Sequence, residues 1–229
     1  MSEHIRGDFN HGAAVDWNAK EVVKDSLYDW QQYGAAGQVQ LSFFQEEVNT
    51  GASLFGAGKK TYEDTNMESS AQMSRGEAFL VHAIALRFVS GVSLVQDDIT
   101  AAAPAALNFP ANDEAEFWNK GWLEFKVLNK VQTRLGPMSN FPPPQQLRLE
   151  ASMSAFYTQA AAADGTIQLA GAHAVPVGQI FVPQEPGITL EYGMKFSLTL
   201  NWSAALAMPS GQAGLVQANL LGVRMRVGQ

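Results

Sequence analysis

The sequence predicts an all-β fold, a sandwich or barrel of about nine to eleven short strands. Three observations lead to this fold class. Several segments alternate apolar and polar residues, most clearly EYGMKFSLTLNW at residues 191–202, where one face would carry Phe196, Leu198, Leu200 and Trp202. Turn signals rich in Gly and Pro separate these segments, and no repeating βα unit is present. We expect Trp202 to be buried because it lies on the apolar face of its strand.

The other predicted strands follow the same reasoning along the chain. QVQLSFFQ at residues 38–45 alternates, and GWLEFKVLNKVQTRL at 121–135 places Leu123, Phe125 and Val127 on an inward face. AFLVHAIALRFV at 78–89 is apolar on both faces, as in a strand that is buried on both sides. Residues 49–76 form a polar, Gly-interrupted connection that is too long to lack a structural role.

A different pattern precedes the first of these strands. The apolar residues of segment 15–33 recur near the helical spacing, and Gly34 is a suitable stop signal, so the sequence predicts a helix there. This divides the chain into an N-terminal arm with a helix, residues 1–37, and a β-sandwich domain, residues 38–229. The segment could pack on its own domain or dock on a neighbouring subunit. We expect docking at least in part, and the candidate interface residues are Trp17, Tyr28, Trp30 and Tyr33.

Composition limits the function classes. The chain has 229 residues, a net charge of −7, 16% charged residues and no cysteine. Disulfides and cysteine-ligated metals are therefore excluded, and neither a signal peptide nor a transmembrane segment is expected. Lys59-Lys60 and Arg224/Arg226 are the nearest approach to a basic cluster, and we interpret them as ordinary surface, without a specific nucleic-acid site. So little charge requires polar uncharged groups or neighbouring subunits to cover the surface.

No catalytic or metal-binding spacing is visible, so we expect neither an enzyme nor a cofactor. The histidines are scattered at His4, His11, His82 and His173, and His82 is interpreted as a core or interface residue. The carboxylates Asp113, Glu114 and Glu116 are interpreted as the start of a helical turn. Glu63 and Asp64 with Asn66 could offer oxygen ligands to Ca²⁺, but they lack the EF-hand spacing.

Three stretches resemble the jelly-roll coat proteins of tailless icosahedral viruses and phages. DTNMESSAQMSRGEAFLVHAIALRF is similar to a polar loop that enters a buried sandwich strand, and FVPQEPGITLEYGMKFSLTLNW is similar to the late strands of a coat protein. AMPSGQAGLVQANLLGVRMR resembles a closing hairpin. Together these stretches cover about half of the chain, and they share a layout, with no catalytic residues to be transferred.

The resemblance implies a virion structural protein, a capsid subunit that self-assembles in the host cytoplasm. Its partners would be copies of itself and other capsid proteins, and contact with a membrane stays open. A single jelly roll fits the strand count better than a compact double one, which remains an alternative.

Two other function classes stay open. A β-sandwich module that binds a carbohydrate or a receptor would use Trp118, Trp122 or Trp202, and a jelly-roll enzyme would need a cluster of histidine and acidic residues.

Overall fold

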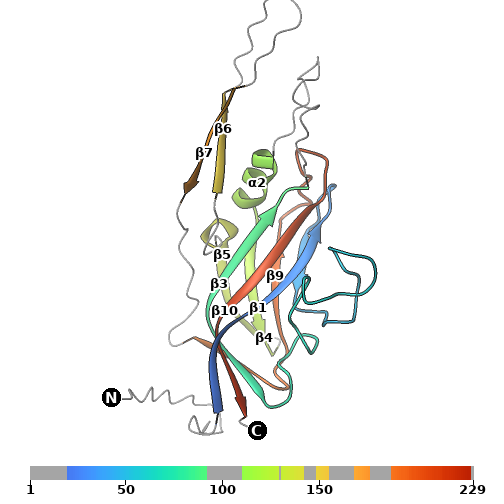
Figure 1. Ribbon diagram of the computed structural model, residues 1–229, viewed down its shortest axis with the longest axis vertical. Helices are drawn as coiled ribbons and strands as arrows, with labels where there is room; N and C mark the ends of the chain where they lie inside the picture. Colours follow the sequence, from blue (N-terminus) through green and yellow to red (C-terminus); the bar gives the residue numbers. More distant parts are fainter. Residues whose placement is uncertain are drawn as a thin grey trace, which may run out of the picture.

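The structure, a computed structural model, describes residues 20–91, 110–128, 130–141, 148–154, 168–175 and 187–227. The described residues form an all-β protein with little helix (Figure 1). Its elements are β1 Lys20–Tyr33, β2 Gln40–Phe43, β3 Glu77–Val89, α2 Pro110–Asn119, β4 Trp122–Val127, β5 Lys130–Pro137, the 3₁₀ turn Met138–Asn140, β6 Arg148–Ser154, β7 Gln168–Val175, β8 Ile188–Glu191, β9 Phe196–Asn201 and β10 Gly214–Val227.

Eight of these strands form two four-stranded antiparallel sheets that make a β-sandwich. The first sheet, sheet A, has the order β1-β10-β3-β8, and the second, sheet B, has the order β2-β9-β4-β5. The remaining strands, β6 and β7, pair only with each other. Alternating residues of both sheets meet in one core, which includes Phe43, Ile84, Phe125, Leu198 and Leu220. An all-β sandwich is therefore confirmed.

The predicted helix at residues 15–33 is wrong over the residues that are described. Residues 20–33 form β1, which pairs with β10 along its whole length, from Lys20 opposite Val227 to Tyr33 opposite Gly214. Leu27 and Tyr33 belong to the core, whereas Trp30 lies on the other face of the strand. This pairing with a distant strand outweighs the helical spacing of a few apolar residues. Residues 15–19 lie outside the described residues.

The strand at residues 78–89 is present as β3, which is buried on both faces except at His82 and Arg87, and a bulge interrupts its alternation. Leu221 lies opposite Ala83 and Gly222 lies opposite Val81, so His82 has no partner in the ladder. The extra residue shifts the alternation by one position. Phe79 and Val81 face the core before the bulge, and Ile84, Leu86 and Phe88 face it afterwards. His82 itself is exposed, so its assignment to the core is wrong.

Strand β9 agrees with the strand predicted at residues 191–202, whereas the expected closing hairpin at residues 207–226 is wrong, because one strand, β10, occupies this stretch. Phe196, Leu198 and Leu200 of β9 are buried, and Trp202 is only 5% exposed, as expected. β10 lies in the middle of its sheet, with β1 on one side and β3 on the other (Figure 1). Both ladders of this strand are thus satisfied, which holds it firmly in the sandwich.

Candidate functional site

The connection between β2 and β3, residues 44–76, covers the outer edge of β1. The Trp30 N–H donates to the Asp64 carbonyl at 2.8 Å, and the Asn66 N–H donates to the Tyr28 carbonyl at 3.3 Å. The Asn66 side chain continues the ladder, since its Oδ1 accepts from the Tyr28 N–H and its Nδ2 donates to the Ser26 carbonyl. The connection therefore closes an edge strand that would otherwise be free to pair with another chain.

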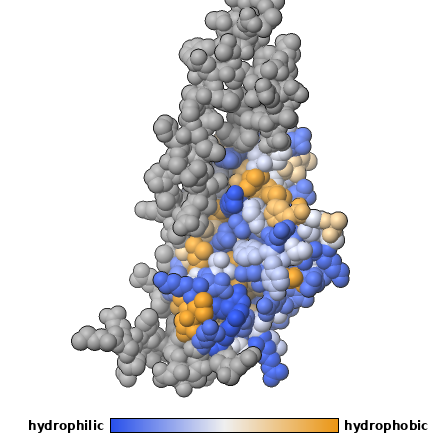
Figure 2. All heavy atoms as spheres, in the orientation of Figure 1, coloured by the Kyte–Doolittle hydropathy of each residue, from blue (hydrophilic) through white to orange (hydrophobic). Residues whose placement is uncertain are grey.

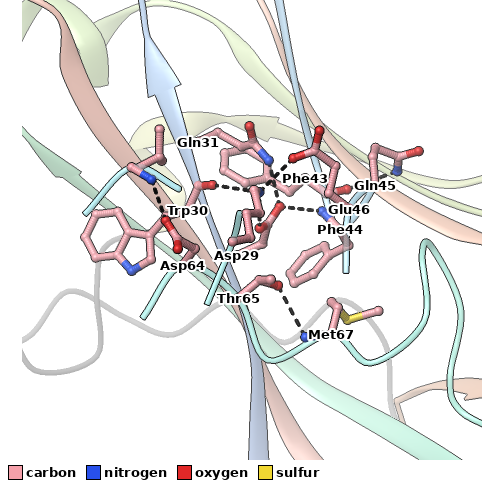
Figure 3. A network of polar contacts seen from close by, with 12 residues as sticks. Asp29, Trp30, Gln31, Phe43, Phe44, Gln45, Glu46, Asp64, Thr65 and Met67 are labelled. Carbon is pink, nitrogen blue, oxygen red and sulfur yellow. Dashed lines mark hydrogen bonds and ion pairs between the residues drawn. The ribbon is translucent and has the colours of Figure 1, made fainter. Parts of the chain in front are cut away.

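A buried ion pair joins this connection to β1 (Figure 3). Lys60 is 2% exposed, and its Nζ lies 3.0 Å from Oδ1 of the fully buried Asp29. The same Nζ lies 3.3 Å from Oε2 of the half-exposed Glu46. Oδ2 of Asp29 accepts from the Phe44 N–H at 2.8 Å and from Nε2 of Gln31 at 2.9 Å. One carboxylate thus holds both ends of the segment from Phe44 to Lys60.

Burial destabilises the charged form of the Asp29 carboxyl, whereas its ion pair and hydrogen bonds stabilise that form. Burial raises the pKa of the Asp29 carboxyl, while Lys60, Gln31 and the Phe44 N–H act in the opposite direction without cancelling the increase. A buried carboxylate of this kind depends strongly on its cation, because removing one partner leaves an uncompensated charge in a poorly solvated place.

Asp64 forms a second buried centre, inside the connection itself. Its carboxylate accepts from the Leu54 N–H at 2.6 Å, the Thr61 N–H at 2.9 Å and the Ser53 hydroxyl at 2.9 Å. Burial would raise the pKa of Asp64, but these hydrogen bonds outweigh it and lower the pKa. The donors come from both ends of residues 53–62, which form the tip of this loop, so the Asp64 carboxylate fixes the shape of the tip.

The connection also contains backbone strain. Phe44 has φ 64° and Ala71 has φ 55°, in the left-handed region that side chains other than Gly seldom occupy. Hydrogen bonds hold both residues: the Ala71 N–H donates to the Phe44 carbonyl at 2.8 Å, and the Phe196 N–H donates to the Ala71 carbonyl at 2.8 Å. Strained positions of this kind persist only where their surroundings determine them strongly.

This framework presents a group of side chains on the outer face of sheet A, which we call the β1 outer patch: Tyr28, Trp30, Phe55, Tyr62 and Arg87. The Phe55 ring meets the Trp30 ring edge-on at 5.4 Å, and the Arg87 guanidinium lies 5.7 Å from the centre of the Trp30 ring. The Tyr28 hydroxyl donates to the Tyr62 carbonyl. Trp30, Gln217 and Arg87 share one row across β1, β10 and β3. The patch is therefore continuous.

The predicted interface residues separate into three groups. Tyr28 and Trp30 belong to the β1 outer patch. Tyr33 instead lies in the core, where its ring packs against Phe117 and Trp202 and its hydroxyl donates to the Leu206 carbonyl at 2.7 Å. Tyr33 is thus a packing residue of its own chain. Trp17 lies outside the described residues.

The two basic pairs contain more than ordinary surface residues. Lys60 is buried in the ion pair with Asp29, whereas Lys59 is exposed. Arg224 is also buried, and its guanidinium lies 2.6 Å from Asp25 and 3.3 Å from Glu77. Arg226 pairs with the same Glu77 at 2.8 Å. The ordinary-surface interpretation is therefore wrong for Lys60 and Arg224, whose charges stabilise contacts within the chain.

The structure assigns packing roles to several of the other candidate polar residues. Asp113 lies in the first turn of α2, as predicted, where its carboxylate accepts from the hydroxyls of Ser90 and Ser210, each at 2.6 Å. The oxygens of Asp64 accept hydrogen bonds within the loop tip. The described residues hold no group of three or more histidine, cysteine or acidic residues that could bind a metal. His4 and His11 lie outside the described residues.

The three tryptophans considered for ligand binding lie in different places. Trp202 is buried, and Trp118 is partly buried against the core. Trp122 is 37% exposed and points away from the core at the start of β4. It shares a row of sheet B with Asn201 and Gln40. Only Trp122 among them presents a ring to a possible ligand.

Sequence reasoning missed the Asp29–Lys60 pair. The two residues are 31 positions apart, so no local motif connects them. One signal was present: Asp29 lies directly between the aromatic residues Tyr28 and Trp30. A charged residue in such a position needs a buried partner.

Comparisons of the chain with protein families, with curated proteins and with solved structures gave no match. In the part of the chain that the structure describes, no helix is long and apolar enough to cross a membrane.

Proposed function

We propose that this chain is a self-assembling coat subunit with a single jelly-roll fold. The observation that carries the proposal is the nesting of the strand pairs. β1 pairs with β10, β2 with β9, β3 with β8 and β4 with β5. Along the sequence each pair is enclosed by the one before it, as successive residue pairs are in one long hairpin. Rolling up such a hairpin gives the eight-stranded, double-sheet arrangement of a jelly roll.

The same pairing favours a single roll over a compact double one. The eight nested strands account for both four-stranded sheets, and β6 and β7 form a separate pair that is inserted between β5 and β8. A double roll would need a second set of eight strands with its own nested pairs.

A jelly roll serves many functions, so assembly needs support from the surface as well. The chain has only 16% charged residues, and several large apolar or aromatic side chains are exposed: Val22, Val23, Val39, Phe55, Tyr62, Trp122, Leu128 and Tyr192. Contacts between subunits would cover such groups, since the centres of protein interfaces are poor in charge and rich in aromatic residues.

Electron microscopy of the purified full chain, concentrated at several salt concentrations and pH values, tests the proposal. We expect closed particles of uniform diameter. Only monomers under all conditions, or only irregular aggregates, would contradict the assembly function.

A second candidate function rests on Trp122. Its half-exposed ring lies in a row with the amide side chains of Asn201 and Gln40, and Ser42 follows Gln40 on the same face of β2. An aromatic ring beside amide and hydroxyl groups suits a saccharide, which combines apolar C–H faces with hydroxyls. A glycan array should then give binding that Trp122→Ala abolishes. No binding by the wild-type protein would exclude this candidate.

A further inference from the structure

We propose that the β1 outer patch is a subunit contact that docks on an acidic surface of a second copy of this chain. The inference rests on the proposed coat function and adds to it the surface that is used and the chemistry of its partner. Sheet A lies in front in the view of Figure 1, so Figure 2 shows its outer face, where hydrophilic and hydrophobic side chains are mixed.

The residue types of the patch are those that contribute most to binding. Phe55 is 44% exposed and Tyr62 is 62% exposed, and Arg87 is exposed beside them. Trp30 lies beneath Phe55 and Arg87 and supports both. Trp, Tyr and Arg dominate the free energy of protein interfaces, where a partner removes them from water.

The patch is already ordered in the single chain. The loop tip that carries Phe55 and Tyr62 is held by Asp64 within the loop and by the Asp29–Lys60 pair on β1. The Tyr28 hydroxyl also fixes the Tyr62 backbone. Little conformational entropy is therefore lost when a partner binds, which favours affinity.

The charge of the patch indicates an acidic partner. Arg87, the one charged residue of the patch, has no carboxylate partner among the described residues, whereas Lys60, Arg224 and Arg226 all do. The chain as a whole has a net charge of −7. A second copy therefore offers an excess of carboxylates that complements this patch.

The same charge determines the type of contact. The patch contains no carboxylate, so a surface that complements Arg87 is a different part of the second copy. The contact is therefore between different surfaces of the two copies, and such contacts, repeated around a closed symmetry, build rings and shells. The edge groups of β1 are already bonded to Asp64 and Asn66. The contact is thus made by side chains, without strand addition.

Two pairs of matched substitutions test the inference in the full-length protein. Arg87→Glu reverses the charge of the patch, and Arg75→Glu makes the same change at an exposed arginine outside it. Tyr62→Ser removes an exposed ring from the patch, and Tyr192→Ser removes a similarly exposed ring elsewhere. Circular dichroism and thermal melting establish that all four variants are folded.

Sedimentation velocity over a concentration series measures assembly. We expect Arg87→Glu and Tyr62→Ser to raise the concentration needed for assembly by about tenfold or more, and both control variants to behave like the wild type. If the patch variants assemble as readily as the controls while the wild type forms particles, the inference is wrong and the coat function stands. If the wild type never assembles, the coat function itself fails.

Discussion

Asp29 and Asp64 are two buried carboxylates, one on the edge strand β1 and one in the connection that covers it, and they are stabilised in different ways. Asp29 lies on the strand and depends on a cation from the connection, Lys60, at 3.0 Å. Asp64 lies in the connection and accepts hydrogen bonds from neutral donors of its own loop. Burial raises the pKa of Asp29, whereas the hydrogen bonds lower the pKa of Asp64. A compact turn can thus satisfy a carboxylate locally, whereas Asp29 fastens the turn to the sheet.

The largest effect on stability should come from breaking the ion pair between Asp29 and Lys60, which attaches the connection to β1. Asp29→Ala removes the buried partner of Lys60 and the acceptor of the Phe44 N–H. We expect the free energy of unfolding to fall by about 3–5 kcal/mol, because a buried cation and a strained residue both lose their partner. Chemical denaturation followed by tryptophan fluorescence measures this change.

Glu46→Ala is the matched control for that change. Glu46 is the second carboxylate near Lys60, at 3.3 Å, but its side chain is half exposed. We expect a loss of at most about 1 kcal/mol, since exposed ion pairs contribute little. An equal cost for Asp29→Ala and Glu46→Ala would contradict the central role of the buried pair.

The next effect concerns the shape of the loop tip. Asp64→Ala leaves the Leu54 and Thr61 N–H groups without their acceptor. We expect a smaller loss of about 2 kcal/mol, because the opened tip lets water reach these donors. Limited proteolysis should also cleave the tip of this variant faster. If Asp64→Ala cost more than Asp29→Ala, the loop tip would be the main anchor.

The two carboxylates should respond to pH with opposite signs. The pKa of Asp29 lies above its ordinary value of 3.8, so its contribution to stability is complete at low pH and is lost as the pH rises through the raised pKa. The pKa of Asp64 lies below 3.8, so its contribution is complete at higher pH and is lost as the pH falls through the lowered pKa.

This difference can be measured with neutral variants. As the pH falls through the raised pKa of Asp29, the wild type should gain stability relative to Asp29→Asn, whereas its advantage over Asp64→Asn should shrink as the pH falls below the ordinary value of 3.8. Urea denaturation at each pH gives both curves. Parallel curves for the two variants would show that the environments are not opposite.

The smallest effect concerns the strain at Ala71. Ala71→Gly should stabilise the protein by up to about 1 kcal/mol, because Gly adopts φ 55° without the steric cost that Ala has there. Ala52→Gly, in the same connection but without a positive φ, should instead destabilise by about 0.5–1 kcal/mol. Thermal melting of both variants provides the comparison. The same sign for both substitutions would argue against strain at Ala71.

The fold was predictable where strands alternate strictly. Phe196, Leu198 and Leu200 gave the faces of β9 directly. β3 was predicted as a strand, but a bulge at His82 shifts its alternation, and a bulge leaves no clear mark in a single sequence. β1 was missed because its spacing is also compatible with a helix, and its partner β10 lies at the other end of the chain.

The site was less accessible to sequence reasoning. The expectation that residues 49–76 have a structural role agrees with the way the connection is bonded to β1, but the attachment depends on Lys60 meeting a strand 31 residues earlier. The patch adds Phe55, Tyr62 and Arg87 to the predicted Tyr28 and Trp30, and only the tertiary fold brings the loop tip and β3 beside β1.

Hydrogen–deuterium exchange of the same full-length chain, in its assembled and dissociated forms, tests most directly whether the chain assembles through the surface that this connection presents. We expect slower exchange in the assembled form for peptides that cover residues 53–62, with little change around Tyr192. Equal exchange of residues 53–62 in both forms, with new protection only elsewhere, would contradict it.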